Sequence, residues 1–139
     1  MNSMHGAPYF PGTNIGGRHT QLQIPNGCGG HFTGGFFPQN APNPNNPNDP
    51  IITPRPGEVR QEQPMQNPDA QTSYRACPES VSEISDSIRN SNYNPGDWSL
   101  ISAPGAPNCT GWACEQLQGA GFTPPMKPQG AYPNAHVNP

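Results

Sequence analysis

Charged residues are scarce in this sequence, which has 6 Lys and Arg, 9 Asp and Glu and a formal net charge of −3 over 139 residues. It contains no run of basic residues, so it lacks the positive surface on which nucleic-acid binding usually depends. No apolar run approaches the roughly 20 residues that cross a bilayer. The first ten residues lack the basic and apolar regions of a signal peptide. We therefore expect no nucleic-acid partner, no membrane span and no signal peptide in this chain, so that export would need another route or a longer polypeptide.

Hydrophobic residues are also few, at 30%, whereas the chain holds 21 Pro and 16 Gly. Such a share of turn-forming residues is typical of low-complexity or disordered chains. The low charge does not fit disorder, because self-repulsion would not keep this chain open. The composition predicts one small domain that is rich in loops.

The distribution of Pro, Gly and Asn divides the chain into four parts. We expect an irregular lead-in at 1–17, a folded domain at 18–125 and a Pro-rich tail at 126–139. Within the domain, 38–72 is predicted to be a long loop insertion, because it begins with the tract "PQNAPNPNNPNDP", which cannot form a regular ladder of hydrogen bonds.

The clearest β-structure is a hairpin at 18–37. "RHTQLQI" (18–24) places Thr20, Leu22 and Ile24 on one side, with polar residues on the other, which is the period of a half-buried strand. Asn26-Gly27 is a strong turn signal, and "HFTGGFF" (31–37) forms the return strand. A short strand is also expected within 97–101.

Two helices are predicted after the loop insertion. The first begins at Pro78 and runs for about 12 residues, with Val81, Ile84 and Ile88 as an apolar stripe. The second runs from about 109 to 118 and ends at a glycine. The fold class is therefore α+β, with an antiparallel sheet packed on a C-terminal helix.

The four cysteines, Cys28, Cys77, Cys109 and Cys114, leave several interpretations open. Two disulfides are one of them, but Cys109 and Cys114 are five residues apart, about 1.4 turns of a helix, which disfavours a bridge between these two. Zinc held by Cys28, His31, Cys109 and Cys114 is another. Against zinc, the helix would point the last two thiols apart.

Cys109 occupies the position that an activated thiol requires. At the start of a helix it meets unpaired N–H groups and the positive end of the helix dipole, which favour thiolate over thiol. A thiolate nucleophile needs a base, and His19 lies in the best predicted strand. In a simple hairpin His19 faces about Phe36, which leaves His31 several residues along the ladder. His19 is on the strand side opposite Leu22, so it needs a bulge or a strand-end position to reach the thiol.

Several segments, taken in order, resemble a known family. "RHTQLQI", "GGFFP" (34–38), "RPGEVR" (55–60), "CPESV" (77–81) and "NCTGWACEQLQGAGFTPP" (108–125) are similar to circularly permuted papain-like cysteine hydrolases. These are relatives of NlpC-type peptidoglycan amidases that act as toxic effectors of bacterial secretion systems, including type VI secretion. In this arrangement the histidine comes first and the cysteine helix last.

The resemblance implies that Cys109 is the nucleophile and His19 the base. Asn108 and nearby backbone N–H groups would steady the oxyanion. The residue that orients His19 is open between a backbone carbonyl, His31 in another register and none at all.

The resemblance also implies the biology of an antibacterial toxin. The substrate would be an amide bond in peptidoglycan stem peptides, cut in the periplasm of a target bacterium after delivery by a secretion system. The protein would act as a monomer without metal or cofactor, and a cognate immunity protein would block it. The alternative is a non-enzymatic, loop-rich interaction module stapled by disulfides or zinc.

Overall fold

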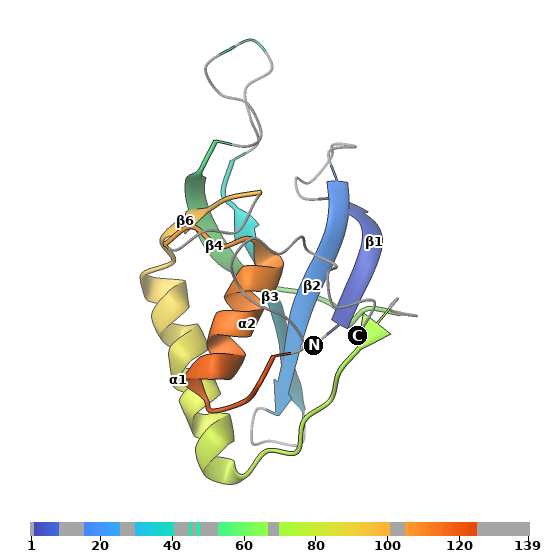
Figure 1. Ribbon diagram of the computed structural model, residues 1–139, viewed down its shortest axis with the longest axis vertical. Coiled ribbons are helices and arrows are strands. Elements are labelled where there is room, and N and C mark those ends of the chain that lie inside the picture. The colour runs from blue at the N-terminus through green and yellow to red at the C-terminus, as the bar shows by residue number, and fades with distance from the viewer. Residues whose placement is uncertain are drawn as a thin grey trace.

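The computed structural model describes residues 2–8, 16–25, 30–40, 45, 47, 53–66, 70–100 and 105–124. This part of the chain is α+β, as predicted: an antiparallel, curled sheet carries two helices (Figure 1). The strands are β1 (Asn2–Pro8), β2 (Gly16–Pro25), β3 (His31–Pro38), β4 (Arg55–Gln61), β5 (Ala70–Gln71) and β6 (Asp97–Trp98), in the order β5-β1-β2-β3-β4-β6. The helices are α1 (Pro78–Tyr93) and α2 (Cys109–Gly119).

The predicted hairpin is present as β2 and β3, although its turn at 26–29 lies outside the described residues. The antiparallel ladder runs from Pro25↔His31 to Leu22↔Gly34. On the N-terminal side of Leu22, the recorded partner of β2 is β1. On the C-terminal side of Gly34, the recorded partner of β3 is β4. The sheet therefore opens between β2 and β3 above this pair, at the end that holds His19.

Two expectations about irregular segments were wrong. Residues 2–8, expected to be part of an irregular lead-in, form β1 and pair with β2. Residues 55–61, expected to lie in a loop insertion, form β4 between β3 and β6. Pro56 and Gly57 are residues typical of turns, but Pro56 lies opposite Asp97 in the short pairing of β4 with β6. Gly57 gives room to Phe36, whose nearest ring atom would lie 2.3 Å from an added Cβ.

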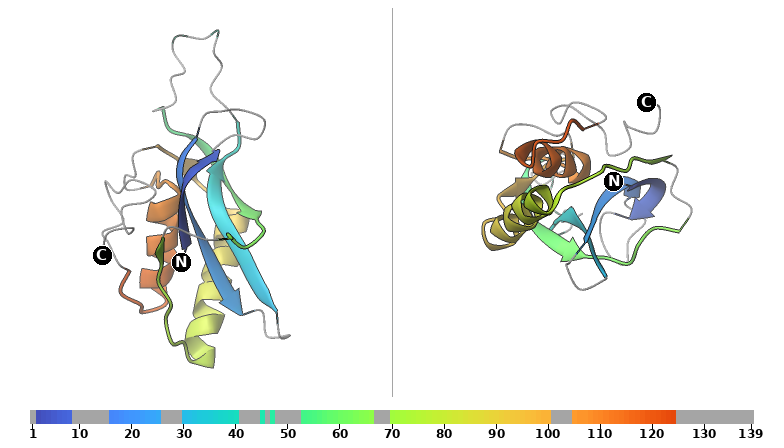
Figure 2. Two further views of the ribbon diagram at one scale, coloured as in Figure 1. Left: turned by 90° about the vertical axis from the view of Figure 1, so that its right-hand side faces the viewer. Right: turned by 90° about the horizontal axis from the view of Figure 1, so that it is seen from below.

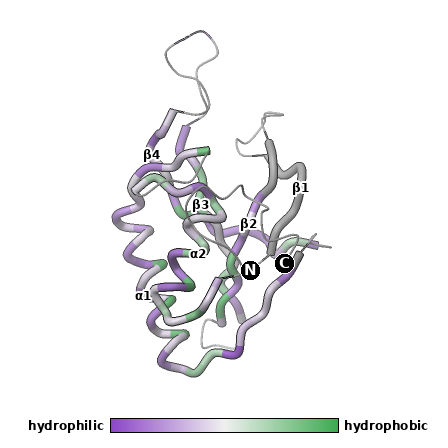
Figure 3. Tube along the Cα trace, viewed as in Figure 1, coloured by the Kyte–Doolittle hydropathy of each residue, from purple (hydrophilic) through white to green (hydrophobic). Residues whose placement is uncertain are grey.

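Both helices pack on the same sheet through a small core (Figure 2). Most of α1 is hydrophilic (Figure 3), and Ile84 and Ile88 are its buried residues, from the predicted stripe. In α2, Trp112 stacks on Phe36 of β3, with ring centroids 6.1 Å apart. None of the described helices is long and apolar enough to cross a membrane.

The end of α2 is fixed by a Schellman motif, which confirms the glycine signal. Gly121 has φ +87°, and its N–H donates to the Gln118 carbonyl. The Phe122 N–H donates to the Leu117 carbonyl at 2.9 Å, and Phe122 packs against the core. These bonds satisfy carbonyl groups that a helix end otherwise leaves unpaired, so α2 is anchored at the end opposite Cys109.

Candidate active site

The structure brings His19 and Cys109 together, although 90 residues separate them. Cys109 is the first residue of α2, and His19 lies in the part of β2 that pairs with β1. Their exposed fractions are 1% and 4%, so both side chains are almost fully buried. His19 was expected to need a bulge or a strand-end position to reach the thiol, and it lies beyond Leu22, where the recorded ladder between β2 and β3 has ended. Thr20 turns toward α2, while the His19 ring lies beside the opening, at the level where α2 begins.

Glu62 completes the group and was not identified from the sequence. Its Oε1 lies 2.7 Å from Nε2 of His19. Glu62 directly follows β4, and its N–H donates to the Thr33 carbonyl at 2.8 Å, which continues the pairing with β3. The available signal was the alternation of Glu58, Arg60 and Glu62, which places a third charged side chain on one face of an extended segment. The prediction of a loop over 38–72 did not take this alternation into account.

The ring of His19 is held in its cationic form. Burial acts to lower its pKa, but hydrogen bonding to Cys109 and to Glu62, together with their negative charges, raises the pKa to about 10. Nδ1 is buried and makes no well-aligned hydrogen bond with a described residue. Because Nε2 is engaged by Glu62, Nδ1 is the nitrogen left to share a proton with the Cys109 sulfur. Contacts of this kind are often poorly aligned until substrate binds.

Gln21 holds Glu62 and the chain that follows it. The Gln21 amide donates to Oε2 of Glu62 at 3.4 Å and to the Gln63 carbonyl at 3.2 Å, and its oxygen accepts from the Met65 N–H at 2.8 Å. Gln21 is itself 1% exposed. The carboxylate that meets His19 is therefore fixed by a buried side chain two residues away from His19 on the same strand.

The imidazole of His19 also contacts an aromatic ring, and a cationic side chain lies over that ring in turn. The ring centroids of His19 and Phe37 are 4.6 Å apart, and the Arg60 guanidinium lies 4.9 Å from the Phe37 centroid. Phe37 rather than the predicted Phe36 thus neighbours His19. Arg60 is paired with Glu58, so its charge is balanced outside the His19–Glu62 contact.

Gly35 of β3 lies against both His19 and Glu62. A Cβ at Gly35 would lie 2.9 Å from His19 Cε1 and 2.9 Å from Glu62 Oε2. We predict that Gly35→Ala lowers turnover by about 10-fold or more, because it displaces the base and its partner together. Gly119→Ala, where an added Cβ meets no atom within 4 Å, is the matched control. Equal activity of both variants and wild type would contradict this role for Gly35.

Asn108 and His31 have other positions than those expected for oxyanion and orienting residues. The Asn108 amide caps α2: Oδ1 accepts from the Gly111 N–H at 2.8 Å, and Nδ2 donates to the Leu100 carbonyl at 3.2 Å. Its side chain therefore has a structural task. His31 is exposed and pairs with Pro25 at the far end of the β2–β3 ladder, so it does not orient His19.

The remaining cysteines do not form the expected alternatives in the described chain. Cys77, Cys109 and Cys114 form no disulfide with one another. Burial, and to a lesser extent the charge of Glu115, raises the pKa of Cys114 to about 12, which keeps it a thiol at neutral pH. No group of three or more metal-ligating side chains occurs among the described residues. Cys28, required for the zinc alternative, lies outside them.

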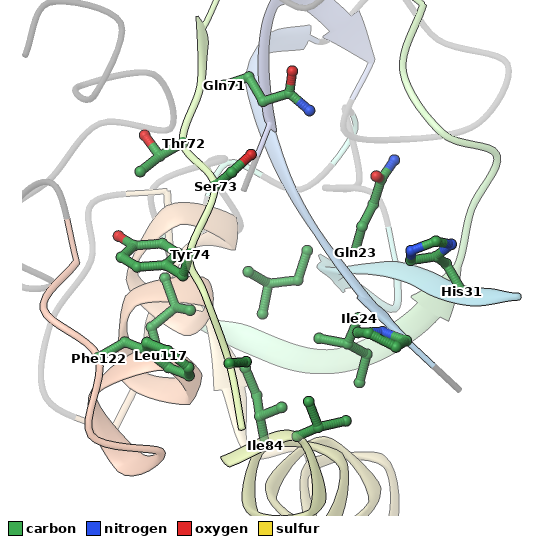
Figure 4. A pocket seen from close by; sticks show the side chains of 14 residues that line it. Gln23, Ile24, His31, Gln71, Thr72, Ser73, Tyr74, Ile84, Leu117 and Phe122 are labelled. Carbon is green, nitrogen blue, oxygen red and sulfur yellow. The ribbon is translucent and has the colours of Figure 1, made fainter. Parts of the chain in front are cut away.

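Two cavities in the described part of the chain lie away from Cys109 and His19. The first has a volume of about 320 Å³ and lies between the end of β2, the segment 71–76 and the helices (Figure 4). Tyr74, Leu117 and Phe122 form its apolar wall, and His31 stands at its rim. The second is lined by Phe32, Ile88 and their neighbours. Cys109, His19 and Glu62 line neither cavity.

Comparison with protein-family models, curated proteins and solved structures found no match to this chain.

Proposed function

We propose that this protein is a cysteine amidase of papain-like type in which Cys109 is the nucleophile, His19 the base and Glu62 the residue that orients His19. The observation that carries the proposal is the engagement of one buried imidazole by a carboxylate on one side and a helix-start thiol on the other. A nucleophile, a base and an orienting group in hydrogen-bonding range of each other are the general requirements of thiol catalysis.

The geometry supports a two-step reaction. In the resting pair the cationic His19 already holds the proton of Cys109, and the Cys109 thiolate attacks the carbonyl carbon of the amide. The His19 proton then passes to the leaving nitrogen as the C–N bond breaks, which releases an amine and leaves a thioester on Cys109. Water, deprotonated by His19, attacks the thioester and releases a carboxylic acid, and the Cys109 thiolate and the cationic His19 are restored.

The negative oxygen of the tetrahedral intermediates requires donors. The first N–H groups of a helix have no partner within the helix, and in α2 they belong to Cys109 and the residues that follow it. The Gly111 N–H is bonded to Asn108, and the Trp112 N–H to the Asn108 carbonyl. We assign the oxyanion to the N–H groups of the first residues of α2, in place of the Asn108 side chain. Because the reacting pair is buried, substrate reaches it by local opening of the chain.

The substrate we propose is a stem peptide of peptidoglycan, in line with the resemblance of the sequence to permuted papain-like amidases. The biological role is that of an antibacterial effector delivered to the periplasm and neutralised by an immunity protein. For the alternative, a non-enzymatic module, no disulfide joins Cys77, Cys109 and Cys114 to one another, and Cys28 lies outside the described residues.

The experiment that tests the substrate is digestion of purified sacculi, followed by mass spectrometry of the soluble peptides. We expect fragments with one new amino end and one new carboxyl end in the stem peptide, and no new reducing ends in the glycan. Protein treated with iodoacetamide is the control and should release nothing. Sacculi that remain uncut at enzyme concentrations far above those toxic to cells would overturn the assignment of substrate.

A further inference from the structure

Two threonines join the halves of the proposed site. Thr20 directly follows His19, and Thr110 directly follows Cys109. Their Oγ1 atoms are 2.7 Å apart, and both residues have an exposed fraction of 0%. The bond crosses 90 positions of sequence, from the strand that carries the base to the helix that carries the thiol.

From this contact we propose that Thr20 and Thr110 are positioning residues, which set the separation between the His19 imidazole and the Cys109 thiol. The inference rests on the proposed function and adds residues to its machinery. It follows from chain geometry: on a strand, neighbouring side chains point to opposite faces. With Thr20 bonded to α2, the His19 ring leaves β2 on the side of Glu62 and Gly35, and from there it also reaches Cys109 at the start of α2.

On the helix, Thr110 fixes the rotation and height of the first turn. Asn108 caps this turn and Trp112 packs on Phe36, so the helix is held at its start and along its side. Neither contact reaches β2 next to His19. The bond between Thr20 and Thr110 is a direct hydrogen bond between β2 and α2, next to His19 and Cys109. A shift of 1 Å between such elements can cost about 10²-fold in rate.

Hydrophobic packing alone would hold α2 on the sheet. The effect of the two hydroxyl groups on the site must therefore be measured separately from their effect on the stability of the fold. Thr→Val keeps shape and volume but removes the hydroxyl. Thr20→Val leaves the Thr110 hydroxyl buried without this bond, which destabilises the fold. Changing both removes the unpaired group, and replacement of both partners by apolar groups of the same shape is often nearly neutral.

The experiment compares Thr20→Val, Thr110→Val, the double variant and Thr110→Ser with wild type and His19→Ala. The readouts are the unfolding temperature and the rate of Cys109 carbamidomethylation between pH 6 and 10. That rate is measured by peptide mapping against exposed Cys77 in the same molecule. We expect the double variant to unfold at a higher temperature than at least one single variant. In the double variant, carbamidomethylation of Cys109 should nevertheless stay about 10-fold slower than in wild type and should depend differently on pH. Thr110→Ser should keep the wild-type rate and the wild-type pH profile.

The outcomes separate this inference from the proposed function. If the Cys109 rate recovers together with stability in the double variant, or never falls, the threonines are only a structural contact and the inference is overturned while the pair stands. If His19→Ala leaves the Cys109 rate unchanged, His19 does not activate the thiol, and both proposals fail. A loss shared by His19→Ala and the double variant, with Thr110→Ser unaffected, supports both.

Discussion

Cys109→Ala is expected to abolish amidase activity and periplasmic toxicity, whereas Cys114→Ala leaves both in place. The two cysteines are five residues apart on α2, and both are buried. Only Cys109 lies against His19, and the raised pKa of Cys114, about 12, keeps that residue an uncharged thiol. Loss of a covalent nucleophile removes the reaction path itself, so turnover should fall by about 10³-fold or more.

The two variants form a matched pair because each removes one buried sulfur atom from the same helix. Each should lower the stability by about 1 kcal/mol, as small core truncations do, so a difference in activity cannot arise from folding. The measurements are growth of a bacterium that exports each variant to its periplasm, release of peptides from sacculi and thermal unfolding. Toxicity of Cys109→Ala equal to wild type would contradict thiol catalysis, and loss of function in both variants would point to the helix core instead.

The sequence was sufficient for the elements whose signals are local. The β2–β3 hairpin follows from alternation at 18–24, and α2 follows from a polar residue before Cys109 and glycines after Leu117. His19 and Cys109 could be selected for the same reason, since each lies in an element that can be predicted by itself. That His19 and Cys109 lie close together depends on the packing of α2 on the sheet, which the stacking of Trp112 on Phe36 supports.

Glu62 could not be predicted because its position depends on a strand without a strand-like sequence. β4 begins with Arg-Pro-Gly, and its pairing is decided by β3 on one side and β6 on the other. β1 is a similar case, since it has no apolar alternation and is recognised by its pairing with β2. Residues that act through long-range pairing, such as Glu62 and the Gly35 beneath it, therefore become visible only in the assembled sheet.

Glu62→Gln is expected to move the alkaline limb of the pH–rate profile to lower pH and to reduce turnover by roughly 10²-fold. In wild type, the hydrogen bonds and charges of Cys109 and Glu62 raise the pKa of His19 to about 10 in spite of burial. The neutral amide of Gln supplies no negative charge, so the pKa of His19 falls. His19 then loses its proton at a lower pH, and the alkaline limb of kcat/KM, which reports this loss in the free enzyme, follows it downward.

Stability should change in the same direction. A histidine whose pKa is raised by folding contributes stability that is fully present below its unfolded value, 6.5, and is lost as pH rises through about 10. Wild type should therefore lose stability across this range, and Glu62→Gln should begin from a lower plateau and lose less. Glu58→Gln is the matched control, since Glu58 lies on the same strand but pairs with Arg60. An alkaline limb that moves equally in both variants would show a general effect of surface charge, whereas a shift confined to Glu62→Gln would place the carboxylate on His19.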